Sequence, residues 1–135
     1  HPILCQKIEE LGYYLKFQGH LPRDIYQFVV LAVAKYTQSS FEWKDHLPHA
    51  LAAGLPKDVI ITLEAHGIAE SYFSEPYLSI IQILQSTLSW KSIPEQVQAK
   101  AIQLYGIKGF IEITVLSGFY QMFSAINQGF NVSKT

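Results

Sequence analysis

Residues 39–49 carry the side chains best suited to chemistry. At about 100° per residue, four polar positions in this segment fall within one arc of a helix, because residues three and four apart are neighbours on a helix surface. These positions are Ser39, Glu42, His46 and His49. A carboxylate four residues before a histidine can hold the imidazole in one tautomer. The spacing therefore predicts His46 as a general acid/base and Glu42 as its orienting or proton-relay partner.

Two other interpretations fit the same residues. A Glu–His contact across one helical turn can lie on a solvated face and do no chemistry. Alternatively, Glu42, His46 and His49 could bind zinc, since ligands on successive turns can converge. The spacing lacks the HExxH signature, however, and no cysteine ligands accompany it. We therefore expect no metal and no cofactor.

The elements that must position these side chains are all predicted to be helices. Apolar residues recur at helical spacing, and no segment shows the alternation of a strand. Four prolines each precede an apolar run, as expected of proline in the first turn of a helix. The predicted helices cover residues 4–17, 22–37, 39–53, 56–65, 75–90, 94–104 and 107–127. We expect an all-α bundle of about six to seven helices in a single domain over residues 1–135.

Two residues are unusual for their predicted helices: a charged residue in an apolar helix and a proline inside a helix. Glu112 is an acid in the most hydrophobic predicted helix, so it needs a partner, and Lys108 one turn earlier is the nearest in sequence. Pro48 removes an amide donor inside the helix of His46, which predicts a kink or a restart at His49, or simply a curved helix.

The composition restricts the possible partners. Charged residues make up only 16% of the 135, which predicts that a partner subunit covers some apolar surface, and hence a homo-oligomer. Ten basic residues against eleven acidic ones give a net charge of −1. Basic runs with interleaved aromatic residues are absent, so we expect no nucleic-acid partner.

The cysteine content and the longest apolar stretch predict the cellular compartment of the chain and whether it spans a membrane. The single cysteine, Cys5, cannot form an intrachain disulfide, which favours a reducing cytoplasm. Charged and polar residues interrupt the apolar stretch 107–126, which we therefore expect to be a buried helix rather than a membrane span.

Two blocks of the sequence resemble the carboxymuconolactone decarboxylase-like family, which includes the AhpD-type peroxidase partners. The first block combines Pro-Arg-Asp-Ile at 22–25, Glu-Trp-Lys-Asp-His at 42–46 and Ala-Ala-Gly-Leu at 52–55. The second combines Tyr-Gly-Ile-Lys-Gly-Phe-Ile-Glu at 105–112 with Ser-Gly-Phe-Tyr-Gln-Met at 117–122 and is similar to that family's C-terminal helix. The resemblance is strongest over residues 22–132.

The resemblance implies an AhpD-like helical fold that assembles as trimers or hexamers. In the AhpD-type members, a CxxC pair and a histidine four residues after its second cysteine perform thiol-dependent peroxide chemistry. Here Ser39 and Glu42 stand at the cysteine positions, and only His46 matches. Neither side chain can cycle through a disulfide, so that route should be absent. Family members also often carry a glutamate on the preceding helix, where this chain has Gln27.

Three functions follow as hypotheses. The first is a cofactor-free lyase, or a related acid/base enzyme, that acts on a small carboxylated lactone or similar acid, with His46 transferring the proton and Glu42 orienting it. The expected substrate contacts are His49, Ser39, Gln27 and Arg23, the last as a carboxylate anchor. The second hypothesis is a catalytically divergent ligand-binding or scaffold protein. The third is peroxiredoxin-like activity, which would depend on Cys5 alone.

Overall fold

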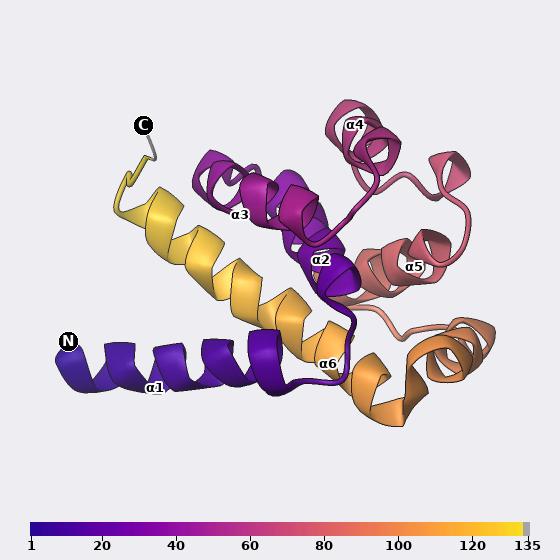
Figure 1. Cartoon of the computed structure of the whole chain (residues 1–135), viewed down its shortest axis with the longest axis horizontal. Helices are drawn as coiled ribbons and strands as arrows, with labels where there is room; N and C mark the ends of the chain where they lie inside the picture. Colours follow the sequence, from indigo (N-terminus) through magenta and orange to yellow (C-terminus); the bar gives the residue numbers. More distant parts are fainter. Residues whose placement is uncertain (134–135) are drawn as a thin grey trace.

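The computed structural model describes residues 1–133, and every regular element in that range is helical (Figure 1). This confirms the all-α prediction. The six α-helices are α1 (Pro2–Tyr13), α2 (Arg23–Tyr36), α3 (Ser40–Ala52), α4 (Lys57–His66), α5 (Tyr77–Leu88) and α6 (Glu95–Gly129). A π-helical turn (Tyr14–Gln18) continues α1, and a short 3-10 turn (Glu70–Tyr72) precedes α5.

Helix α2 occupies the centre of the molecule. All ten residues from Ile25 to Ala34 are buried, and α2 packs against α3, α5 and α6. Each buried Val, Leu, Ile or Phe side chain contributes roughly 1.5–3 kcal/mol relative to an exposed one. The C-terminal helix, which we predicted to be buried, buries one side and exposes Ile107, Ile111 and Val115 on the other. Part of the apolar surface of this helix therefore remains exposed in the single chain.

Helix α6 bends sharply at Gly106, whose φ of 72° and ψ of 170° are not helical. Glycine suits this position because a positive φ strains residues that carry a Cβ. The two helices predicted on either side of this glycine are therefore the two arms of α6. By length and mean hydropathy (1.2), α6 alone among the described residues could cross a membrane. That is weak evidence, since 44% of the apolar window is buried in the fold and core helices pass the same test.

Prolines and glycines mark most helix ends. Pro22, Pro56 and Pro94 lie directly before the first residue of α2, α4 and α6. Each of these helices therefore begins one residue later than predicted. Gly54 and Gly67 follow α3 and α4 with positive φ, as is typical of glycines that end helices. Helix α3 continues through Pro48 to Ala52, so it does not restart at His49.

Glu112 joins α6 to the turn that follows α1. Both carboxylate oxygens accept hydrogen bonds from the His20 backbone N–H, at 2.8 and 3.0 Å, and the His20 ring lies 2.9 Å from Oε2. The prediction that Lys108 is the partner of Glu112 is therefore wrong. Gly19 is required beside this contact because an added Cβ would collide with the Glu112 carboxylate. Since α1 itself has no buried residue, this carboxylate and the buried Leu15 of the π-helical turn anchor the N-terminal segment.

Candidate functional site

A cleft of about 640 Å³ lies where α1, its π-helical turn, α2, α3 and α6 meet. Its lining gathers the side chains that could do chemistry: Cys5, Glu9, Lys16, Tyr26, Glu42, Asp45, His46, Tyr120 and Asn127. The rest of the wall is largely apolar and comes mainly from Ile8, Phe41, Phe119, Phe123 and Ile126. The cleft therefore suits a small, mostly apolar molecule with one polar end.

His46 is held through both ring nitrogens. Its Nε2 lies 3.4 Å from Glu42 Oε2, across the helical turn that the sequence spacing predicts. Its Nδ1 lies 3.0 Å from the side-chain oxygen of Gln27 on α2. An amide oxygen only accepts hydrogen bonds, so Nδ1 carries the proton. This fixes Nε2 as the nitrogen that is available for chemistry beside Glu42.

Glu42 is buried and is oriented from two directions. Its Oε1 accepts a hydrogen bond of 2.7 Å from the Asn127 side-chain amide of α6. Its backbone N–H donates to the Ser39 hydroxyl at 3.4 Å, because Ser39 is the N-cap of α3. Ser39 was predicted to contact substrate, but it does not line the cleft and acts by capping the helix.

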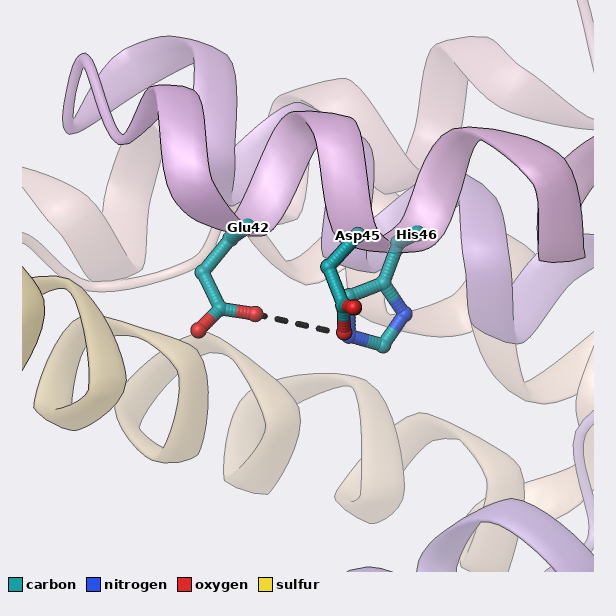
Figure 2. Close-up of side chains that lie close together, drawn as sticks. All are labelled: Glu42, Asp45 and His46. Carbon is teal, nitrogen blue, oxygen red and sulfur yellow. Dashed lines mark ion pairs between the residues drawn. The ribbon is translucent and has the colours of Figure 1, made fainter. Parts of the chain in front are cut away.

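Asp45 completes the polar group on α3. Its Oδ2 lies 3.8 Å from His46 Nε2, and its side chain is about one-third exposed. Figure 2 shows Glu42, Asp45 and His46 projecting from the same side of α3. Two carboxylates therefore share one imidazole nitrogen.

Two phenols lie beside the imidazole. The Tyr26 and Tyr120 hydroxyls are 2.7 Å apart, and the Tyr120 ring stands edge-on to the His46 ring at 5.3 Å between centroids. Burial raises the pKa of Tyr120 and, next in importance, so does the neighbouring Tyr26. Burial likewise raises the pKa of Tyr26. Both phenols are therefore neutral at ordinary pH and serve as hydrogen-bond groups rather than as phenolate bases.

Arg23 and His49, both predicted to contact substrate, lie around a separate hollow of about 310 Å³. The Arg23 guanidinium lies over the Phe17 ring at 4.5 Å from its centroid. Lys16, Tyr26 and Gln27 also line this hollow, so it adjoins the region behind His46. The predicted arc is thus divided, because only Glu42 and His46 of its four residues line the large cleft.

Sequence reasoning missed Asn127, Asp45, Lys16 and the tyrosine pair. Asn127 offered a usable signal, since a polar side chain in an apolar helix needs a partner, as Glu112 does. Asp45 was equally visible at one helical turn from Glu42. The tyrosines gave no such signal, because aromatic residues at helical spacing are normal in a core.

Comparison with known proteins gives no match. Neither a protein-family model, nor a curated protein, nor a solved structure matches the chain. The chemistry of the site must therefore be inferred from its own geometry.

Proposed function

We propose that this cleft is the active site of a cofactor-free acid/base enzyme that acts on a small, largely apolar organic acid, with His46 as the proton-transferring group. One observation carries the proposal. His46 Nε2 and Glu42 Oε2 lie 3.4 Å apart, both residues are buried, and both line a cleft large enough for a small molecule. A positioned acid/base of this kind typically contributes about 10²–10⁴-fold to a rate.

Each neighbour of His46 has a distinct task in this mechanism. Gln27 keeps the proton on Nδ1, so only Nε2 exchanges protons with a molecule in the cleft. A proton on Nε2 lies against Glu42, which stabilises the imidazolium and takes part in returning the proton. Asn127 prevents the Glu42 carboxylate from turning away.

The resemblance to carboxymuconolactone decarboxylases suggests a reaction. In a decarboxylation, the bond between the substrate carbon and its carboxylate breaks, the electron pair stays on that carbon, and carbon dioxide leaves. The Nε2 proton then moves to the carbon, and a proton from water restores the imidazolium. The electron pair is delocalised into the neighbouring lactone or keto carbonyl until the proton arrives, and no electrons leave the substrate, so the reaction needs no oxidant.

The charges of the cleft limit the substrate. Lys16 is the cation that lines it, whereas Arg23 lies in the smaller hollow. We therefore assign the carboxylate-anchoring role to Lys16 and not to Arg23. Glu9, Glu42 and Asp45 also line the cleft. They repel polyanions, so a monocarboxylate is the favoured class.

A homo-oligomer, which the resemblance would make a trimer or a hexamer, is part of the same proposal. Apolar side chains on the outer surfaces of α1 and α6 support it. Ile3, Leu11, Ile111 and Val115 are between 41% and 70% exposed. A second copy that covers such residues would gain the burial that the monomer lacks.

The test is carbon dioxide release from a panel of carboxylated lactones and related keto acids. We expect turnover by the wild type, a loss of at least about 10²-fold in His46→Ala, and a smaller loss in Glu42→Gln. His66→Gln is the matched control, because His66 stacks on Tyr72 away from the cleft. Equal rates in the wild type and His46→Ala would refute the proposal. Binding of panel members without turnover would favour a ligand-binding protein.

A further inference from the structure

We infer that Glu42, Asp45 and His46 also form a binding site for one divalent transition-metal ion, with one ligand atom from each side chain. The three ligand atoms all lie within 4.8 Å of one another. His46 Nε2 is 3.4 Å from Glu42 Oε2 and 3.8 Å from Asp45 Oδ2. Ligands at roughly 2.0–2.1 Å from a tetrahedral zinc ion are about 3.3 Å apart, so small side-chain movements close the site.

The groups around the triad support this inference independently of the three ligands. Metal-binding histidines almost always donate their other ring N–H to a carbonyl or carboxylate, and metal-binding carboxylates are themselves hydrogen-bonded. His46 Nδ1 pairs with the Gln27 side-chain oxygen at 3.0 Å, and Asn127 donates to Glu42 Oε1 at 2.7 Å. These contacts from α2 and α6 leave Nε2 and Oε2 directed at the same point.

The charge and the surroundings of the triad favour a cation. Two carboxylates share one imidazole nitrogen, and all three side chains are buried or partly buried, at 6%, 35% and 10% exposure for Glu42, Asp45 and His46. A divalent ion compensates both negative charges. The adjoining cleft leaves its remaining coordination positions open to water or a small ligand. The imidazole selects zinc, cobalt, nickel or copper over magnesium and calcium, which prefer oxygen ligands alone.

The triad differs from the alternative zinc site of Glu42, His46 and His49, against which the missing HExxH spacing counted, and it departs from the expectation of no metal. His49 is exposed and lines the smaller hollow. Asp45, three residues after Glu42, takes the third place instead. The ligand pattern is thus Glu-x-x-Asp-His within two turns of α3.

Metal binding and proton transfer both need the lone pair of His46 Nε2. A metal ion at this nitrogen therefore blocks the acid/base reaction, and zinc should inhibit turnover in a 1:1 ratio. Only this inhibition depends on the proposed function. The metal site itself depends on the geometry of the triad.

The experiment titrates metal-stripped protein with Co²⁺, followed by its visible absorption, and with Zn²⁺ by calorimetry. We expect one ion per chain and binding at least about tenfold weaker in Asp45→Asn, Glu42→Gln and His46→Gln. Gln27→Leu should also weaken binding about 10–100-fold, although it removes no ligand. His66→Gln and His1→Gln should bind as the wild type does. Circular dichroism and thermal unfolding verify that every variant is folded.

Three results of these titrations would bear on the proposed metal site. Absence of 1:1 binding, or binding that Asp45→Asn leaves unchanged, overturns the inference. Loss of binding in His1→Gln alone would place the ion at the N-terminus and overturn it too. Turnover measured in the presence of a chelator separates the two proposals. If the protein is inactive on every substrate with the chelator present, yet binds one ion at the triad when titrated without it, the metal site stands while the acid/base function fails.

Discussion

Asn127 donates a hydrogen bond of 2.7 Å to Glu42, although the two residues lie 85 positions apart in the chain. Asn127 is close to the C-terminal end of α6, and Glu42 is in the first turn of α3. The carboxylate that faces His46 is therefore oriented by the last helix of the fold. Local helix geometry brings Glu42 and His46 together, and α6 determines how the carboxylate turns.

Replacing Asn127 should therefore affect both stability and the site. In Asn127→Leu the buried Glu42 oxygen loses its donor, which costs about 1–3 kcal/mol in the free energy of unfolding. Urea denaturation measures this loss. A double-mutant cycle with Glu42→Gln provides the control, because the cost should shrink when the carboxylate is already gone. Additive effects would mean that the contact contributes nothing of its own.

Gln27 should control the tautomer of His46. In Gln27→Leu the Nδ1 proton has no acceptor, so the neutral ring can place its proton on either nitrogen. Nitrogen NMR of the imidazole should show a single tautomer in the wild type and a mixture in the variant. Turnover, where a substrate is found, should fall about 10-fold or more. An unchanged spectrum would show that another group fixes the ring.

Gly19 should tolerate no side chain. In Gly19→Ala the new Cβ meets the Glu112 carboxylate and the Leu15 carbonyl oxygen. The tether between α6 and the N-terminal segment must shift, and we expect a loss of about 1–3 kcal/mol in the free energy of unfolding. Gly118→Ala is the matched control. Its Cβ would have no neighbour within 4 Å, so this helical substitution should stabilise by about 0.5–1 kcal/mol. Equal effects of the two substitutions would contradict the role of Gly19.

Tyr105 should weaken the fold at high pH. Its hydroxyl is buried and has no hydrogen-bond partner among the described residues. Burial, followed by the charge of Glu75, raises the pKa of Tyr105 above its ordinary 10.0. Above that pH the unfolded chain releases the phenol proton while the folded chain keeps it, so stability falls as the pH rises further. Below that pH the phenol is neutral in both states, so it adds no pH dependence to the stability.

Tyr105→Phe removes both effects. It should stabilise the protein by about 1 kcal/mol at pH 8, because an unsatisfied polar atom is gone. The variant should also lose less stability than the wild type between pH 8 and pH 11, where urea unfolding of the two proteins is compared. A variant that loses as much as the wild type would show that Tyr105 does not titrate with folding.

Local patterns in the sequence predicted the parts of the structure that depend on neighbouring residues. Apolar spacing identified the helices, and Gly106 separated the two arms of α6. The Glu42–His46 contact was also predictable, because one turn of helix fixes its distance. Pro56 and Gly67, which bound α4, show the same principle at the level of single residues.

Contacts between distant segments could not be predicted in this way. The partner of Glu112 is 92 residues away at His20, and nothing in either local pattern connects them. The different places of His46 and His49 depend on how α3 rotates against α2 and α6. That rotation is decided by the packing of whole helices, which periodicity along a single helix does not specify.

Helix α1 forms one wall of the cleft without burying a residue of its own. The groups proposed for proton transfer lie instead on α3 and are held by α2 and α6. Shape and chemistry are thus assigned to different elements. Substitutions at Ile8, Gly12 or Lys16 can reshape the binding space at little cost in stability, since exposed and half-exposed positions usually tolerate change within about 0.5 kcal/mol. The same chemical centre can therefore be adapted to new ligands by changes confined to the first helix and its π-helical turn.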